Sequence, residues 1–245
     1  MSADERQPAA PHLNSAAWRR LLLEGELEVE GRMPWSSNAT FLVTVRSGEL
    51  RARAIYKPGI GERPLWDFPS GLYQREVAAF ELAAATGLAV VPETVLREGP
   101  FGEGSLQRFI DANFAEHYFS LLEGSEHHDA LRLVGGFDLL ANNADRKAGH
   151  LLLGPGGKIW GIDNGLCFHA EDKLRTVIWD FAGEPLPEAV LEAAARVASR
   201  VPEPLARLLD RREVNALRVR ARELLKRPVF PAPDLDEHCY PWPLV

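Results

Sequence analysis

Two short polar segments in the second half of the chain each carry an aspartate in a setting suited to phosphate chemistry. The first spans residues 142–150 (NNADRKAGH), between an apolar stretch and a strand, and contains Asp145 and Lys147. The second places Asp163 directly after an apolar strand and before Asn-Gly. Phosphoryl transfer asks little covalent chemistry of a protein. It needs neutralised phosphates, a metal held by carboxylates, and an acceptor hydroxyl aimed in line.

Each residue of the two segments has a chemical role open to it and a plain alternative. Asp145 would orient an acceptor hydroxyl or take its proton, and Lys147 would offset charge on the γ-phosphate. Asp163 would bind Mg²⁺, which takes one or two carboxylates together with phosphate oxygens. The alternative is that both segments are only turns, because Asn-Gly and Asn/Asp-rich sequences are strong turn signals.

Two further charged residues occur earlier in the chain, in the order that a kinase needs. Lys57 ends an expected strand, from which its amine could reach the α- and β-phosphates. Glu76 flanks the apolar stripe of an expected helix and could pair with Lys57. Taken singly, each is more simply a solvated surface charge. The two polar segments and the stretches around Lys57 and Glu76, four segments in all, together favour a nucleotide site.

The elements that must position these residues follow from hydrophobic periodicity and from turn signals. The chain begins with strands, contains one long helix after a loop rich in Pro and Gly at 58–71, and becomes mostly helical after residue 160. We expect strands at 27–31, 40–45, 50–56, 90–95, 104–110, 151–153 and 158–162, and helices at 16–24, 72–86, 129–140, 187–200, 203–210 and 213–226.

This order of elements predicts an α+β fold of two lobes, with a cleft between them as the natural ligand site. We expect a disordered N-terminus at 1–14 and a β-rich N-lobe at 15–110. A mainly helical C-lobe at 111–227 would carry the catalytic and metal loops. The Pro-rich tail at 228–245 is expected to lie extended on the surface.

The four segments resemble the phosphatidylinositol 3-/4-kinase family, most closely the type II 4-kinases and small actinobacterial proteins of that class. Residues 143–146 (NADR) and 162–166 (IDNGL) are similar to the N-T-D-R and I-D-N-G-L-A-F stretches of type II enzymes. Residues 56–58 (YKP) are similar to the segment of the nucleotide lysine, and 107–109 (QRF) lie where the hinge would be. The likeness covers roughly Pro34 to Ala182.

The resemblance implies a bilobal, protein-kinase-like fold that uses ATP and Mg²⁺ (or Mn²⁺). It implies that Lys57 contacts the α/β-phosphates and pairs with Glu76, that Asp145 is the catalytic aspartate, and that Asp163 binds the metal. The further nucleotide-binding positions that it implies are Ser36 and Ser37 over the phosphates, and the backbone groups of Gln107, Arg108 and Phe109 at the adenine.

One position departs from the family's pattern. Five residues after the catalytic aspartate the family usually has Asn, which helps to hold the metal, and this chain has His150. Imidazole is a poor ligand for Mg²⁺ and suits Mn²⁺ and later metals better. His150 is therefore a second metal ligand, a hydrogen-bond donor or proton carrier near the γ-phosphate, or a packing residue.

The composition indicates which classes of partner and which cellular compartment suit this protein. Lys plus Arg is 28 and Asp plus Glu is 35, so the net charge of −7 disfavours nucleic acid and anionic membrane surfaces. Cys167 and Cys239 are the two cysteines, no signal peptide begins the chain, and no apolar run is long enough to span a bilayer. We expect a cytoplasmic bacterial protein with no integral membrane association; its oligomeric state stays open.

The sequence supports a kinase that transfers the γ-phosphate of ATP to a hydroxyl acceptor. That acceptor would be a soluble polyol or inositol-like molecule, a protein, or phosphatidylinositol. Because of His150, two alternatives stay open. One is a nucleotide-binding pseudokinase that regulates a partner, and the other is a protein nucleotidyltransferase.

Overall fold

The computed structural model describes residues 13–34, 38–234 and 238–245 of the chain. The disorder expected at the N-terminus concerns residues 1–12, which lie outside this description, and Asn14, which does not. Asn14 is the N-cap of helix α1 (Ser15–Glu24), because its side chain accepts from the N–H of Ala17 at 2.9 Å. The helix expected at 16–24 therefore begins one residue earlier, at Ser15.

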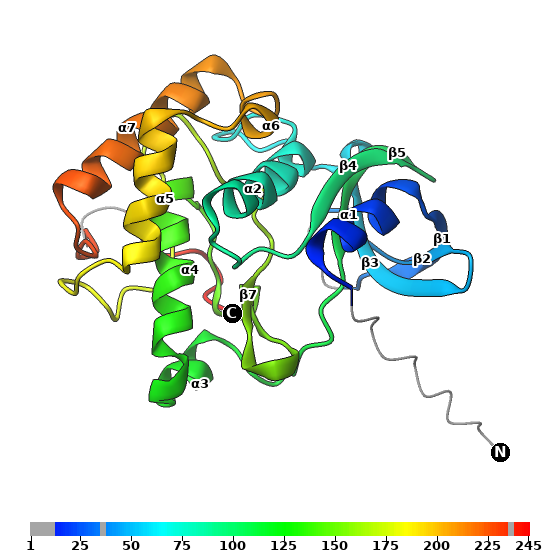
Figure 1. Ribbon diagram of the computed structural model, residues 1–245, viewed down its shortest axis with the longest axis horizontal. Helices are drawn as coiled ribbons and strands as arrows, with labels where there is room; N and C mark the ends of the chain where they lie inside the picture. The colour runs from blue at the N-terminus through cyan, green and yellow to red at the C-terminus, as the bar shows by residue number, and fades with distance from the viewer. Residues whose placement is uncertain (1–12, 35–37, 235–237) are drawn as a thin grey trace.

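The N-terminal half forms a five-stranded antiparallel sheet in the order β1-β2-β3-β5-β4. Helix α1 packs over one face of it, on the right of Figure 1. Trp18, Leu21 and Leu22 of α1 form a small core with the buried side chains of this face. The strands are β1 (Glu26–Arg32), β2 (Phe41–Ser47), β3 (Leu50–Pro58), β4 (Thr94–Gly99) and β5 (Gly102–Arg108).

The alternation along β3 decides which way Lys57 points. Ala52, Ala54 and Tyr56 are buried in the core under α1. Side chains of a strand alternate between its two faces, so Lys57 lies on the opposite face, toward the second half of the molecule. The period-2 pattern of the sequence therefore places the Lys57 amine on the face of the sheet that meets the helical half.

Helix α2 (Leu72–Thr86) lies between the sheet and the C-terminal helices (Figure 1). It contacts β4 and β5 on one side and α5 and α6 on the other. Gly87 ends it with a φ of +83°, the left-handed conformation that glycine adopts without steric cost. Ala78, Ala79 and Leu82 are fully buried, so α2 is a shared wall between the two halves.

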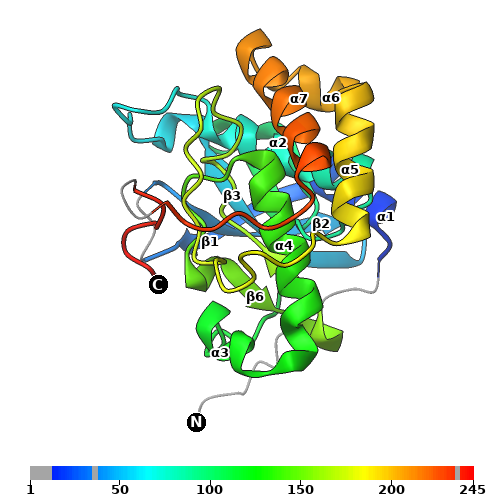
Figure 2. The same cartoon turned by 90° about the vertical axis from the view of Figure 1, so that its left-hand side faces the viewer.

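The second half is mainly helical, and one large apolar core joins its helices with the inner side of α2. Figures 1 and 2 show α4, α5 and α7 as neighbouring long helices. The helices are α3 (Tyr118–Glu123), α4 (His128–Ala141), α5 (Glu188–Ser199), α6 (Glu203–Ala206) and α7 (Arg211–Lys226). The hairpin strands are β6 (Leu151–Leu153) and β7 (Ile159–Gly161), and the short 3₁₀ turns are η1 (Gly59–Gly61), η2 (Ser125–His127), η3 (Ala148–His150) and η4 (Pro155–Gly157).

This arrangement is the expected α+β fold with a β-rich N-terminal and a helical C-terminal region. The strand expected at 90–95 is wrong in position, because β4 begins at Thr94. Val90 and Val91 instead belong to the helical core, and the carbonyl of Val90 accepts from the N–H of Gly161 at 2.7 Å. Pro92 has no N–H to give to a sheet ladder, which accounts for the later start.

Two other expectations about elements need correction. The helix expected at 203–210 ends at Ala206 and is followed by a turn, in which the N–H of Leu208 bonds the carbonyl of Leu205 at 3.1 Å. Helix α3 falls where no element was expected. Its six residues are too few to show a helical period in the sequence.

The tail after Pro228 contains no helix or strand among its described residues, and it does not lie on the surface throughout. Phe230 and Cys239 are buried. The carbonyl of Cys239 accepts from the N–H of Thr176 at 3.1 Å, and the carbonyl of Leu244 accepts from the N–H of Ala148 at 2.7 Å. The tail therefore returns from the end of α7 to the segment that follows Asp145. None of the described helices is both long and apolar enough to cross a membrane.

Candidate active site

The face of β3 that turns away from its core brings Lys57 to two carboxylates. The Lys57 amine donates to Glu76 of α2 and to Asp163, which follows β7. The three residues come from positions up to 106 apart in the chain. Burial works to lower the pKa of Lys57, but the charges of Asp163 and Glu76 raise it above its ordinary value. The amine is therefore held charged between the two lobes.

Glu76 is held in place from both sides. Only 3% of the residue is exposed, and its second carboxylate oxygen accepts from the main-chain N–H of Asn164 at 3.0 Å. Burial raises the pKa of Glu76, and the charge of Lys57 opposes that rise. The carboxylate thus links α2 to β3 and to the segment after β7. Glu76 is part of the site's framework. From the sequence alone it could be placed only beside the apolar stripe of its helix.

Asp163 sits in a left-handed backbone conformation, with a φ of +59°. This conformation is uncommon for residues other than glycine, and such residues concentrate at functional sites. The charge of Lys57 holds the pKa of Asp163 well below its usual range, against burial, which acts to raise it. Its side chain stays 51% exposed, so an ionised carboxylate faces the space between the lobes.

Arg146 ties the first polar segment to the second. Its buried guanidinium makes a bidentate pair with Asp138 of α4, with Nε at 2.9 Å from Oδ2 and Nη2 at 2.9 Å from Oδ1. The same group donates to the carbonyl of Ile162 at 2.6 Å and to the side chain of Asn164 at 2.7 Å. A Cβ on Gly161 would lie 3.1 Å from Nη2, so the glycine leaves room for this approach. The planar fork of arginine suits four fixed acceptors of this kind.

The two asparagines before Asp145 shape the loop that carries it. Asn142 ends α4 with a φ of +55°, and its side chain donates to the carbonyls of His169 and Glu171 at 3.0 and 2.7 Å. Asn143 donates to Asp138 at 3.0 Å and accepts from the N–H of Asp145 at 3.0 Å. The loop is therefore a hydrogen-bonded frame built from side chains, which goes beyond a simple turn.

Asp145 is a carboxyl with an altered acidity. Burial raises its pKa to about 6, against the charge of Lys147, whose amine lies 3.3 Å from Oδ2. Lys147 thus reaches Asp145 in this structure. A carboxyl that titrates near neutral pH suits a group that takes a proton during a reaction.

His150 lies between the two aspartates. Nδ1 is 2.9 Å from the main-chain carbonyl of Asp145, and Nε2 is 3.3 Å from Oδ2 of Asp163. Burial lowers the pKa of His150 to about 4, so the imidazole is neutral at neutral pH. In one tautomer Nδ1 accepts from the N–H of Lys147 at 3.4 Å, and in the other Nδ1 carries the ring hydrogen and donates to the carbonyl of Asp145. In the second tautomer Nε2 presents its lone pair toward Asp163.

The donor set fits a divalent cation only when phosphate oxygens complete it. Within the described parts of the chain, no group of three or more His, Cys, Asp or Glu side chains could hold a metal ion. Asp163 and His150 offer one carboxylate and one imidazole nitrogen toward the same space. Magnesium sites in kinases commonly take one or two carboxylates and fill the remaining positions with phosphate oxygens and water.

The segment expected to hold adenine is occupied by other contacts. The N–H of Arg108 bonds the carbonyl of Glu93 at 2.8 Å, and the N–H of Phe109 bonds that of Arg53 at 3.1 Å. Gln107 is a β5 residue paired with its neighbours in β3 and β4, and its side chain donates to Thr94 at 2.9 Å.

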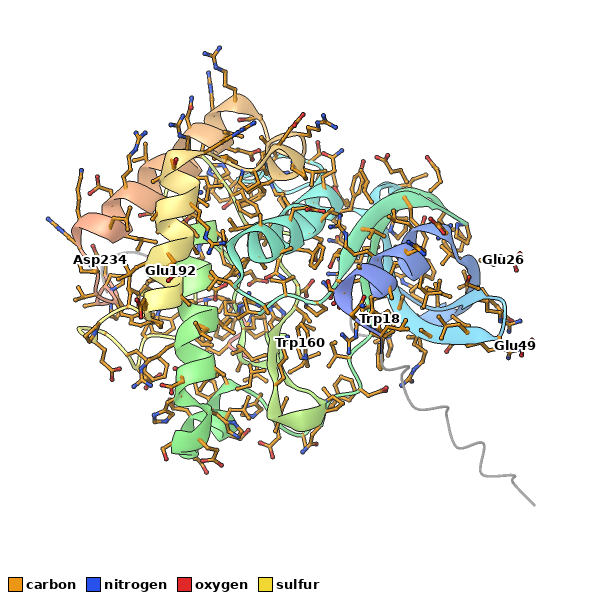
Figure 3. The ribbon with its side chains drawn as sticks, in the orientation of Figure 1. Trp18, Glu26, Glu49, Trp160, Glu192 and Asp234 are labelled. Carbon is orange, nitrogen blue, oxygen red and sulfur yellow. The ribbon has the colours of Figure 1, made fainter. Side chains whose placement is uncertain are left out.

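The Arg108 side chain lies over two indole rings, those of Trp18 in α1 and Trp160 in β7, with its guanidinium carbon 4.7 and 5.5 Å from the ring centres. Both tryptophans are labelled in Figure 3. Arg108 thus bridges the two halves of the molecule, and a role for 107–109 at adenine stays a prediction.

Ser36 and Ser37 lie outside the described residues. Lys173 and Arg175 both approach Oδ2 of Asp67 at 3.6 Å and so tie the loop 58–71 to the helical half.

Sequence reasoning missed four residues of the framework, which are Asp138, Asn164 and the buried pair of Arg75 with Glu213. The one available signal was a charged residue inside an apolar helical pattern, which applies to Asp138.

Known proteins give two informative likenesses. The chain is 41% identical over 261 aligned residues to Protein Rv2133c of Mycobacterium tuberculosis (strain ATCC 25618 / H37Rv), and this alignment covers 91% of the chain and 94% of that protein. Among solved structures it is similar to the crystal structure of the Helicobacter pylori proinflammatory kinase CtkA. That match has a TM-score of 0.50 and 14% sequence identity, and it covers 85% of this chain and 94% of the other. The likeness shows a kinase-like bilobal fold. The sequence matches no model of a known protein family.

Proposed function

Because this chain belongs to the same family as the mycobacterial protein Rv2133c and has a kinase-like fold, we propose that it is a phosphotransferase that uses ATP and a divalent cation. The γ-phosphate would pass to a hydroxyl acceptor. The observation that carries this proposal is the unbroken chain of contacts from Glu76 through Lys57, Asp163 and His150 to the Asp145 loop.

Each member of this chain has a physical task toward a triphosphate. Lys57, held by Glu76, supplies a fixed positive charge for the α- and β-phosphates. Asp163, ionised and partly exposed, is the carboxylate that holds a divalent cation, which neutralises charge on the phosphates. Lys147, now 3.3 Å from Asp145, would turn to the γ-phosphate when the nucleotide is present.

Asp145 acts on the acceptor. Its carboxylate accepts a hydrogen bond from the acceptor hydroxyl and receives its proton as the oxygen bonds to the γ-phosphorus. The bond between that phosphorus and the β–γ bridging oxygen breaks, and ADP leaves. The frame of Asn143 and Arg146 fixes the main chain on both sides of Asp145, so the carboxylate needs little reorganisation.

The resemblance of residues 143–146 and 162–166 to phosphatidylinositol 3-/4-kinases belongs to this proposal. It leaves three acceptors in view, which are a soluble polyol or inositol-like molecule, a protein hydroxyl and phosphatidylinositol. The cytoplasmic location expected from the composition also belongs to the proposal.

Release of ADP from ATP tests the activity. Purified protein is incubated with ATP and either Mg²⁺ or Mn²⁺, alone and with mixtures of polyols, lipid headgroups and bacterial proteins. We expect acceptor-dependent ADP release that falls at least a hundredfold in Asp145→Asn. The matched control is Asp129→Asn, a fully exposed carboxylate on α4, which should leave the rate unchanged.

The same reactions separate the alternatives. Nucleotide-dependent thermal stabilisation without ADP release in any mixture would show a nucleotide-binding regulator and overturn the kinase. Transfer of radiolabel from α-³²P-ATP to protein would show a nucleotidyltransferase instead.

A further inference from the structure

The imidazole of His150 and the carboxylate of Asp163 face each other as two hydrogen-bond acceptors. In the tautomer in which Nδ1 of His150 donates to the main-chain carbonyl of Asp145 at 2.9 Å, Nε2 carries a lone pair and no hydrogen. Nε2 lies 3.3 Å from Oδ2 of Asp163. Two converging acceptors repel one another unless a cation or a donor stands between them. Lys57 does not fill this place, because its amine is on Oδ1.

The separation of these two atoms suits two ligands of one ion. Ligands at about 2.1 Å from a metal lie about 3.0 Å apart in an octahedral site and about 3.4 Å apart in a tetrahedral site. The observed 3.3 Å falls between these values without any movement of either side chain. The anchor at Nδ1 is the arrangement that commonly orients a metal-binding histidine, since a bond to a carbonyl fixes both the tautomer and the ring plane.

The geometry points to a metal preference, and we propose that His150 and Asp163 together bind a first-row transition ion such as Mn²⁺ in preference to Mg²⁺. This inference rests on the proposed function, because the remaining ligands would be phosphate oxygens of the nucleotide and water. Mg²⁺ takes hard oxygen ligands and binds imidazole poorly, whereas imidazole is an ordinary ligand of transition ions. His150 is accordingly a metal ligand and not a proton carrier.

The surroundings support a fixed ligand over a mobile acid or base. Only 14% of the His150 side chain is exposed, and its main-chain carbonyl accepts from the N–H of Ile162 at 2.9 Å. That hydrogen bond connects the His150 segment to the strand that leads into Asp163. The two ligands therefore keep their spacing through a main-chain contact, which is what a preformed chelate needs.

The experiment measures binding and not turnover. Wild-type protein and His150→Asn are titrated with Mg²⁺ and Mn²⁺ in the presence of the non-hydrolysable nucleotide AMP-PNP, by calorimetry. We expect the ratio of Mg²⁺ to Mn²⁺ dissociation constants to be at least tenfold larger for wild type than for His150→Asn. Asparagine supplies an oxygen ligand at the same position, so it should restore Mg²⁺ binding. Equal ratios in the two proteins would overturn the inference.

A spectroscopic signature decides the ligand itself. Electron spin-echo spectra of the Mn²⁺ and AMP-PNP complex should show coupling to an imidazole nitrogen in wild type, lost in His150→Asn. Absence of that coupling in wild type would overturn the inference, and this result stands even if the variant does not fold. Uniform ¹⁵N labelling of the protein separates its nitrogen from those of the nucleotide.

The inference and the proposed function fail in different ways. If AMP-PNP binds with equal preference for the two metals and no nitrogen coupling appears, the nucleotide site stands and the role of His150 is wrong. If AMP-PNP binds with neither metal, the proposed function itself is wrong, and the preference inferred from it falls as well.

Discussion

The ionised carboxylate of Asp145 destabilises the folded protein, and the size of this effect depends on pH. Burial raises its pKa from the ordinary value of 3.8 to about 6, so the folded state binds a proton more tightly than the unfolded chain does. The contribution of Asp145 to wild-type stability is therefore lost as pH rises through this interval, and this loss is complete above about pH 6 to 7, where the folded carboxyl is ionised as well. A neutral side chain of the same shape would avoid the loss.

We predict that Asp145→Asn is more stable than wild type at pH 8, by on the order of 1–3 kcal/mol. The difference should shrink as pH falls and vanish below about pH 3, where the wild-type carboxyl is largely protonated in both states. Thermal or urea unfolding of both proteins at five pH values measures it. A variant no more stable than wild type at pH 8 would show that the carboxylate is well solvated or well paired.

At the residue scale the sequence identified charged residues that meet in the structure, and it missed part of the framework that holds them. Lys57, Glu76, Asp145, His150 and Asp163 were named from residue type, order and resemblance, and the structure brings them into one network. No role was assigned to Asp138 or Asn164, the partners of Arg146, because side-chain hydrogen bonds across 8 and 18 residues leave no local pattern in a sequence.

At the scale of elements, helix α2 matters because it carries Glu76. In this structure α2 is anchored to the helical half through a buried ion pair between Arg75, one residue before Glu76, and Glu213 of α7. Glu213 also closes the capping box of α7, where it accepts from the N–H of Asp210 at 2.9 Å. The position of Glu76 is therefore set by a contact to a helix more than 130 residues later in the chain.

We predict that Glu213→Gln destabilises the protein by about 3 kcal/mol, because it leaves the guanidinium of Arg75 buried without its counter-charge. It should also raise the KM for ATP severalfold, since α2 loses the anchor next to Glu76. Denaturant unfolding and steady-state kinetics give the two values. The control is Glu203→Gln, a helix-surface carboxylate paired with Arg207, expected to cost less than about 0.5 kcal/mol. Loss of stability with no change in KM would separate α2 anchoring from catalysis.

Long elements with a clear period were predictable from the sequence, and short or buried ones were not. Helices α2 and α7 lie close to their expected bounds, since each has an apolar face or strong end signals. The strand expected at 90–95 was wrong in position, because a short apolar run is compatible with both a buried strand and a buried loop. Only the tertiary core decides where Val90 and Val91 pack.

At the scale of the whole molecule, the tail returns from the end of α7 to the loop of Asp145. The carbonyl of Leu244 accepts from the N–H of Ala148, and that of Cys239 accepts from the N–H of Thr176 and from the indole of Trp179 at 3.2 Å. The sequence predicted an extended tail from its prolines. It gave no sign that the tail would contact a loop nearly 100 residues earlier.

We predict that deletion of residues 239–245 destabilises the protein by about 2–4 kcal/mol, because three donors and a buried side chain lose their partners. Exchange of the Ala148 and Thr176 amide hydrogens should become faster by at least tenfold, while exchange in β2 and β3 stays within a few-fold once corrected for global stability. The control is removal of Val245 alone, which is 62% exposed. Unchanged exchange at Ala148 would show that the tail does not support the Asp145 loop.

The central claim is that Lys57 from the sheet and Asp163 from the helical half serve one nucleotide. The most direct measurement is the calorimetric affinity for AMP-PNP with Mn²⁺ in wild type, Lys57→Met, Asp163→Asn and the exposed control Lys226→Met, each verified as folded by thermal unfolding. The account predicts at least a tenfold loss of affinity in both site variants and none in the control. Wild-type affinity in either folded site variant would contradict it.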